Sequence, residues 1–114
     1  MDPNFNDIIR CYNKNWYSTV PGAYKVQGGP PTGVMDPSSE KTFQFITGLF
    51  NDFNTLFPDN MIMLGGDEVF TSCYKENPNI DAFMKSKGIA TYTDLFQYHI
   101  DRTKQILNKI NPKK

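Results

Sequence analysis

The chain has 114 residues, of which 39% are hydrophobic and 14% aromatic, which is enough material for one compact domain but not for two. Its 12 basic and 12 acidic residues give a formal net charge of zero, so nothing steers it toward nucleic acid or an anionic membrane surface. No run approaches the roughly 18 apolar residues of a membrane span, and residues 1–6 are polar, unlike a secretory leader. We therefore expect a small neutral or polar ligand.

Residues 1–35 are predicted to form one long ordered loop. Loops longer than about 12 to 15 residues are uncommon in compact domains and tend to be functional or disordered. Here aromatic side chains favour order, and a flexible surface segment is the alternative. The turn-forming residues are Pro21, Gly22, Gly28, Gly29, Pro30, Pro31 and Gly33, and the aromatic ones are Tyr12, Trp16, Tyr17 and Tyr24.

A helix is predicted over residues 36–57. Asp36 can cap its first turn by accepting a backbone N–H bond, and Pro37 suits the first helical position, where its missing donor costs nothing. The apolar residues that follow recur every three to four positions, so the helix should bury one wide stripe, and Pro58 should end it. The stripe consists of Phe43, Ile46, Leu49, Phe50, Phe53, Leu56 and Phe57.

Residues 61–65 are predicted to form a strand. The run Met61-Ile62-Met63-Leu64 is short, unbroken and followed by two glycines, which is typical of a strand covered on both faces in a parallel sheet. Periodicity alone does not exclude the alternative that these residues form a short buried helix. A lone strand cannot pair its own N–H and C=O groups, so we expect neighbouring strands to lie outside this sequence.

Two helices are predicted after the strand. The first follows Asn77 and Pro78, a cap and a proline, and stops at Gly88, which adopts the left-handed conformation easily. The second begins near Thr93 and ends before Pro112. The order of loop, helix, strand, helix and helix indicates an α/β fold.

Two adjacent carboxylates, Asp67 and Glu68, follow the predicted strand. The carboxyl ends of parallel strands form the active-site face of barrel enzymes, and Gly65 and Gly66 would let the backbone turn tightly or approach a ligand. Neighbouring carboxylates move each other's pKa apart, so that one can donate a proton near neutrality while the other stays an anion. The alternative is a turn-forming Asp67 beside a solvated Glu68.

The residues around this pair match a known pattern in order and spacing along nearly the whole chain. They are Cys11-Tyr12, Asp36-Pro37, Thr42-Phe43, Phe45, Phe57-Pro58-Asp59, Leu64-Gly65-Gly66-Asp67-Glu68-Val69, Cys73-Tyr74, Asn77-Pro78, Ile80, Phe83-Met84 and Gly88. This pattern resembles the catalytic segment of glycoside hydrolase family 20, the β-N-acetylhexosaminidases. The resemblance implies an α/β fold that is part of a (β/α)8 TIM barrel.

A whole barrel needs about 250 residues, so the resemblance implies that residues 1–114 are an internal fragment of one. Residues 1–35 would be the loop after strand three and residues 36–57 a helix. Residues 61–65 would be strand four, and residues 66–114 the catalytic loop with two helices.

The resemblance implies an enzyme that removes terminal N-acetyl-D-hexosamine residues by substrate-assisted retaining catalysis, in which the sugar's 2-acetamido oxygen attacks the anomeric carbon. Glu68 would be the general acid and then the general base. Asp67 would orient the acetamido group and stabilise the charge on its nitrogen. The expected partners are glycans ending in N-acetylglucosamine or N-acetylgalactosamine, with no cofactor and no metal. Whether the parent protein is a dimer stays open.

The two cysteines, Cys11 and Cys73, lack the short spacing of a zinc or redox site, and the residues alone leave either two thiols or one long-range disulfide. The resemblance implies the disulfide, because the family pairs cysteines at these positions. A disulfide in turn implies an oxidising route and a lysosomal or secreted protein.

Two positions depart from the family pattern: Met63 stands where a histidine is usual, and Tyr74 where a tryptophan is usual. The only histidine, His99, falls on the apolar face of the last helix and is interpreted as a packing residue. Residues 65–70 also resemble the GGDEF signature of diguanylate cyclases, but that signature lies in a hairpin, whereas Cys73 and a proline-capped helix follow here. The other alternative is an incomplete or degenerate, non-enzymatic homologue, and we expect the chain alone to be inactive.

Overall fold

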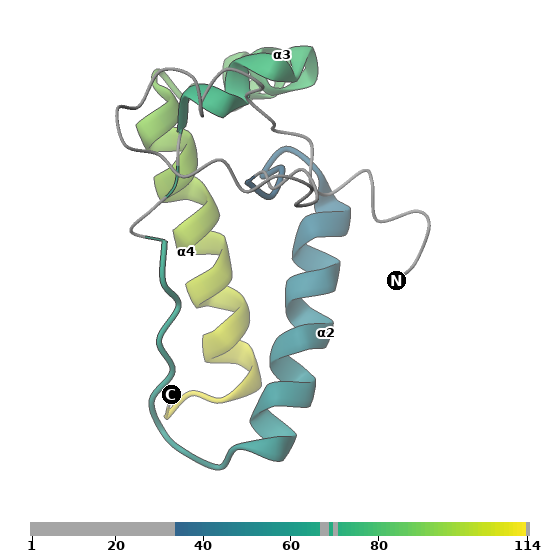
Figure 1. Ribbon diagram of the computed structural model, residues 1–114, viewed down its shortest axis with the longest axis vertical. Coiled ribbons are helices and arrows are strands. Elements are labelled where there is room, and N and C mark those ends of the chain that lie inside the picture. Colours follow the sequence, from purple (N-terminus) through teal and green to yellow (C-terminus); the bar gives the residue numbers. More distant parts are fainter. Residues whose placement is uncertain (1–33, 67–68, 70, 114) are drawn as a thin grey trace, which may run out of the picture.

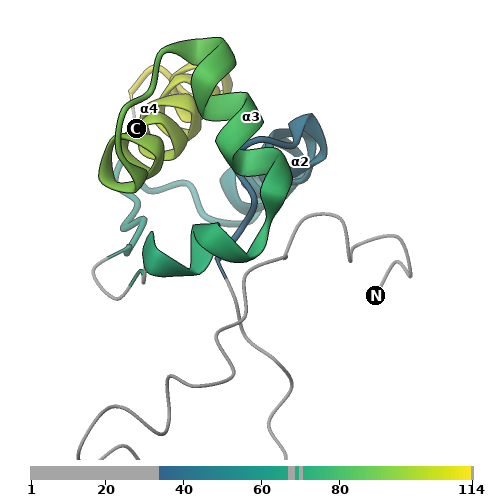
Figure 2. The same cartoon turned by 90° about the horizontal axis from the view of Figure 1, so that it is seen from above.

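The computed structural model describes residues 34–66, 69 and 71–113, and the statements below concern these residues. In chain order they form helix α2 (Glu40–Leu56), the short 3-10 helix η2 (Thr71–Glu76), α3 (Pro78–Lys87) and α4 (Tyr92–Ile110). Figure 1 shows the long helices α2 and α4 side by side, and Figure 2 shows α3 crossing their upper ends. The loop predicted for residues 1–35 lies almost wholly outside the described residues.

The start of α2 differs from the prediction. The helix begins at Glu40 rather than next to Asp36, and its N-cap residue Ser39 makes no side-chain capping bond. The Asp36 carboxylate instead accepts bonds from the backbone N–H of Ser38 at 2.9 Å and from its hydroxyl at 2.6 Å. The Ser39 N–H donates to the Asp36 carbonyl at 3.3 Å, which closes a turn with Pro37 at its second position. This local bonding competes with the helix and delays its start.

No strand forms within described residues 61–66, so the prediction for residues 61–65 is wrong for this structure. The segment runs beside α4 without regular secondary structure, as Figure 1 shows. Met61 is 86% exposed and Met63 is 94% exposed. The physical reason is that a strand needs a neighbouring strand to bond with its N–H and C=O groups. Apart from an isolated bridge residue, Met35, the described residues contain no β-structure.

The two later helices confirm the predictions for this part of the chain. The Asn77 side chain caps α3 by accepting the Asn79 N–H at 3.0 Å, and Gly88 ends the helix with φ +68°. Helix α4 starts one residue earlier than expected, because Thr91 caps it by accepting the Asp94 N–H at 3.1 Å. The short helix η2 was not predicted. None of the described helices is long and apolar enough to cross a membrane.

The described part has a closed end, which comprises η2, α3 and the first turns of α4. Its core is formed by four buried apolar side chains from these three elements: Tyr74, Ile80, Met84 and Leu95. Below it, Phe43 and Ile46 of α2 are buried against α4, and Arg102 of α4 lies 4.0 Å over the Phe43 ring. The buried contact between α2 and α4 therefore adjoins this core.

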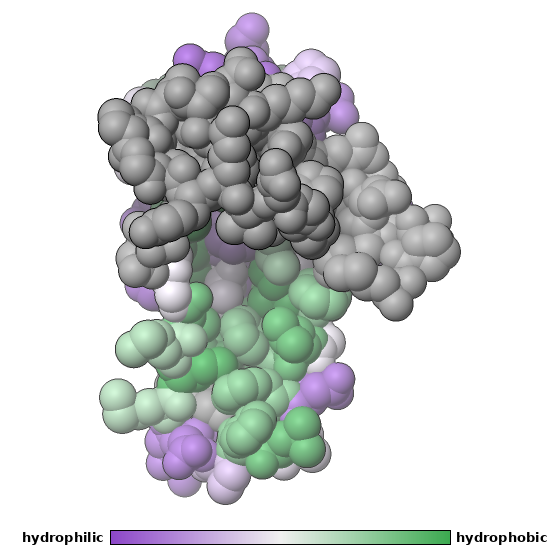
Figure 3. Space-filling view, in the orientation of Figure 1, coloured by the Kyte–Doolittle hydropathy of each residue, from purple (hydrophilic) through white to green (hydrophobic). Residues whose placement is uncertain are grey.

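The opposite, open end comprises residues 49–64, which are the second half of α2 and the segment after it. Large apolar side chains lie on its surface, and the lower half of Figure 3 is accordingly mostly hydrophobic. They are Leu49, Leu56, Phe57, Met61, Met63 and Leu64, with exposed fractions between 41% and 94%. The apolar stripe predicted for α2 is therefore buried only in the first half of the helix.

Candidate active site

The candidate site is approached by the segment that ends in Gly65 and Gly66. Both glycines have positive φ angles, +69° and +99°, in a region that other residues rarely adopt. A Cβ atom at Gly66 would lie 3.1 Å from Cζ of Phe96 on α4, which leaves little room for a side chain. The chain thus turns sharply against α4 immediately before Asp67 and Glu68.

The predicted site residues themselves are only partly within the described chain. Asp67, Glu68 and Cys11 lie outside the described residues, and Cys73 belongs to η2 but its side chain is also outside them. The roles of the two carboxylates and the disulfide between the cysteines therefore stay predictions.

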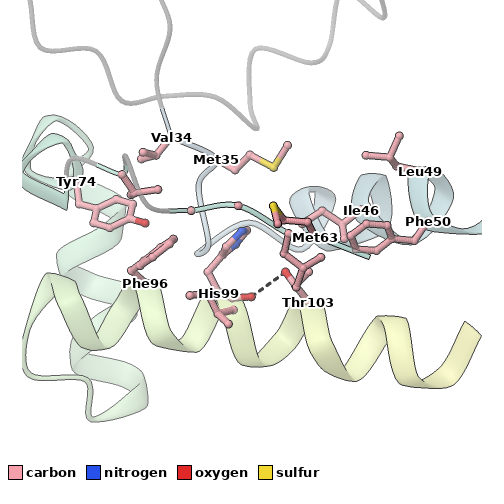
Figure 4. A pocket seen from close by; sticks show the side chains of 15 residues that line it. Val34, Met35, Ile46, Leu49, Phe50, Met63, Tyr74, Phe96, His99 and Thr103 are labelled. Atoms are coloured by element: carbon pink, nitrogen blue, oxygen red, sulfur yellow. Dashed lines mark hydrogen bonds between the residues drawn. The ribbon is translucent and has the colours of Figure 1, made fainter. Parts of the chain in front are cut away.

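A pocket of about 460 Å³ lies between α2, α4 and residues 63–66 (Figure 4). Figure 4 shows Phe96, His99 and Thr103 rising from α4, while Met35 and Met63 come from the segments on the other side. Nearly all of the lining side chains are apolar. A sugar, whose hydroxyls require several convergent polar groups, would find few partners here. We therefore interpret the pocket as a gap between helices and segment and not as the sugar site.

His99 occupies the packing position that its helical spacing indicated. Its ring stacks on Phe96 with centroids 6.3 Å apart and lies 5.8 Å from the ring of Phe43. Its Nδ1 atom is buried and has no hydrogen-bond partner among the described residues, and burial lowers the pKa of the imidazole. The neutral form is therefore favoured here. Of the two departures from the family pattern, Met63 borders the pocket and Tyr74 fills the core of the closed end.

One buried polar contact was missed by the sequence analysis. Nδ2 of Asn77 donates to Oδ2 of Asp36 at 2.9 Å, and both residues are only 6% exposed. The two residues were interpreted separately as helix caps. A local sequence pattern carries no signal for a contact between residues 41 positions apart.

A metal centre finds no support in the part of the chain that the structure describes. No group of three or more histidine, cysteine, aspartate or glutamate side chains lies close enough there to hold an ion.

Within the described residues, helices α2 and α4 thus flank an apolar segment that ends in two glycines of positive φ. Comparison with known proteins gives the family of the chain. Residues 6–114 match the model of the glycosyl hydrolase family 20 catalytic domain, and the chain belongs to this family.

The chain is also similar to curated proteins that are named as β-hexosaminidases. It is 37% identical over 106 residues to the β-hexosaminidase subunit beta of Mus musculus, covering 92% of this chain and 18% of that protein. It is 41% identical over 76 residues to the subunit alpha of Mus musculus, with 67% and 14% covered. It is 31% identical over 110 residues to a probable β-hexosaminidase of Arthroderma benhamiae, with 96% and 17% covered. The matches thus span less than a fifth of these relatives.

Proposed function

We propose that this chain is the segment of a β-N-acetylhexosaminidase that carries the general acid of the active site. The observation that supports this most is the family match over residues 6–114, which includes the adjacent carboxylates Asp67 and Glu68. The two left-handed glycines before them are consistent with a backbone that must turn at the end of a barrel strand.

In the proposed reaction the enzyme supplies a proton and the substrate supplies the nucleophile. Glu68 protonates the glycosidic oxygen as the bond to the anomeric carbon breaks, while the 2-acetamido oxygen of the sugar attacks that carbon. Asp67 accepts a hydrogen bond from the acetamido N–H and stabilises the positive charge that develops on the oxazolinium ion. Glu68 then takes a proton from a water molecule as the water oxygen attacks the anomeric carbon and displaces the acetamido oxygen. This opens the oxazolinium ring, regenerates the 2-acetamido group and leaves the product with retained configuration. The substrates are glycans that end in N-acetylglucosamine or N-acetylgalactosamine.

The open end is the part of the structure that favours the fragment interpretation. Burying an apolar side chain such as those of Leu56, Met61 and Met63 is worth roughly 1.5 to 3 kcal/mol, so leaving several in water is unfavourable. The strands of a barrel would pair with residues 61–65 and cover both this surface and the apolar pocket. The proposed activity accordingly belongs to a longer protein, and this chain alone is expected to be inactive.

A catalytically incomplete or degenerate homologue is the second candidate. It is favoured by the same exposed open end and by Met63, which replaces the histidine expected next to the site. The proposed disulfide between Cys11 and Cys73, and with it a lysosomal or secreted location, is independent of this choice.

Hydrolysis of a chromogenic β-N-acetylglucosaminide tests the proposal, measured with this chain and with a form of the protein extended in both directions. We expect activity only in the longer form. There, Glu68→Gln should lower kcat by about 100- to 10,000-fold on a substrate with a poor leaving group, because general acid catalysis typically contributes that much. Normal turnover by the Glu68→Gln variant would contradict the assignment, and inactivity of the longer wild-type form would favour the degenerate homologue.

A further inference from the structure

The buried contact between Asp36 and Asn77 joins two parts of the chain that are 41 positions apart. It lies at the closed end, where the chain enters α2 on one side and α3 on the other. A buried hydrogen bond to a carboxylate contributes more than most surface contacts do. The contact therefore fixes the starts of α2 and α3 relative to each other.

Both side chains are held from more than one direction. Asp36 accepts two bonds from Ser38 through Oδ1 and the bond from Asn77 through Oδ2. Its carbonyl also accepts the hydroxyl of buried Thr42 at 2.7 Å. Asn77 uses Oδ1 to cap α3 and Nδ2 to reach Asp36. Neither side chain can rotate away without breaking a second bond, so the contact is rigid.

The position of this contact along the sequence connects it to the candidate catalytic residues. The segment of residues 67–76 contains Asp67 and Glu68, and Asn77 follows it directly. The Asn77 side chain is held by its bond to Asp36. Loss of that bond would let the segment shift at its C-terminal end.

We propose that Asp36 and Asn77 are positioning residues, whose hydrogen bond holds the segment after Glu68 in the place from which Glu68 delivers its proton. This inference rests on the proposed function of Glu68. Neither residue touches the substrate in this proposal. The effect is transmitted by the chain, and a displacement of about 1 Å at a reacting group is enough to lower a rate by about 100-fold.

An exchange of the two side-chain types tests the contact itself. Asn77→Asp keeps a good cap for α3 but sets two carboxylates against each other, and Asp36→Asn sets two amides against each other. In the double variant Asp36→Asn/Asn77→Asp, the donor and the acceptor have changed places, so the hydrogen bond can form again. The new carboxylate can still accept the Asn79 N–H.

The readout is the dependence of kcat on the leaving group, measured in the active longer form of the protein. General acid catalysis matters most for an alkyl or sugar aglycone and least for an activated aglycone such as dinitrophenol. With Asn77→Asp we expect kcat to fall about 10- to 100-fold on the alkyl glycoside and less than about threefold on the dinitrophenyl glycoside, with little change in KM. Most of the loss should return in the double variant. If Asn77→Asp does not fold, Asp36→Asn takes its place in the same comparison.

Asn111→Ala is the matched control. Asn111 caps the other end of α4 and donates to Asn54 of α2 at 3.0 Å, so it is also an asparagine that ties a helix end to α2, but far from the glycines. We expect it to lower kcat on both substrates to the same small extent.

The outcomes separate this proposal from the one on which it rests. If Glu68→Gln shows the leaving-group dependence but Asn77→Asp lowers kcat equally on both substrates, or the double variant recovers nothing, the contact is only structural. If Glu68→Gln shows no such dependence, or the longer wild-type form is inactive, the proposed function fails and the positioning role fails with it.

Discussion

The closed end and the open end of the structure differ in how much of their apolar surface the chain covers by itself. At the closed end, Tyr74, Ile80 and Leu95 are at most 1% exposed, because η2, α3 and α4 meet there. At the open end, Leu56 is 71% exposed and Met63 94% exposed, because nothing in the described chain lies over them. Figure 1 shows the helices that meet at the closed end, and Figure 3 shows the hydrophobic lower half.

This difference shows which elements find their partners within the described chain and which do not. Helices satisfy their own backbone hydrogen bonds, and the 10-residue helix α3 finds its packing partners, η2 and α4, within the described chain. A strand has no such independence, so the segment of residues 61–65 keeps its apolar composition but not its predicted structure. The described chain therefore covers the closed end by itself, while the apolar side chains of the open end stay exposed, as the fragment proposal expects.

The largest expected effect is at the core of the closed end. Leu95→Ala should lower the free energy of unfolding by about 2 to 5 kcal/mol, because Leu95 is fully buried and the truncation leaves a cavity. Urea denaturation followed by far-UV circular dichroism measures this change.

Met63→Ala is the control at the open end, and it should change the unfolding free energy of this chain by less than about 0.5 kcal/mol, since Met63 is already in water. In the longer form, where the proposed strands would cover it, the same substitution should cost about 2 kcal/mol or more. Equal effects of Met63→Ala in both forms would contradict the proposal that a barrel covers the open end.

An intermediate effect is expected at the turn that joins the two ends. Gly66→Ala should lower the unfolding free energy by about 1 to 3 kcal/mol, because φ is +99° and the new methyl group would press on Phe96. Gly65→Ala, with φ +69° and open space, should cost about 1 to 2 kcal/mol. Gly48→Ala is the control: Gly48 is exposed inside α2, so alanine should stabilise the chain by about 1 kcal/mol. A neutral Gly66→Ala would mean that the turn relaxes easily.

The sequence predicted the helices well because their signals are local. Asn77 and Gly88 mark the ends of α3 within a few residues of each other, and the periodicity of α4 needs no partner to be recognised. The start of α2 was wrong by four residues, from Asp36 to Glu40, because Asp36 bonds with Ser38 and Asn77 instead of capping the helix. A contact between residues 41 positions apart leaves no mark in a local pattern.

For the candidate site, the motif identified the family, but spacing alone could not supply geometry. Gly65 and Gly66 were predicted to allow a tight turn, and their positive φ angles are compatible with that role. The contact of Gly66 with Phe96 depends on how α4 packs, which a sequence pattern does not specify. In the proposed function the roles of Asp67 and Glu68 depend on partners from a whole barrel, which no local pattern in this sequence can specify.

The smallest expected effect concerns the pH dependence of the packing between the two ends. His99 lies between the rings of Phe43 and Phe96, and its burial lowers the pKa of the imidazole below the ordinary value of 6.5. The unfolded chain therefore binds a proton that the folded chain resists, so the stability that neutral His99 provides is present above pH 6.5 and is lost as the pH falls through the lower folded pKa. Arg102, which lies 4.0 Å over the Phe43 ring, keeps its charge over this range.

His99→Phe keeps an aromatic ring at this position but removes the titrating group. The difference in unfolding free energy between the variant and the wild-type chain should therefore increase in favour of the variant from pH 8 to pH 5, while acidic groups common to both cancel. Urea denaturation at three pH values measures this difference. A constant difference would show that water reaches the imidazole and that the packing around Phe43 and Phe96 is looser than the structure indicates. The region between α2 and α4 would then be incompletely covered, as the open end is.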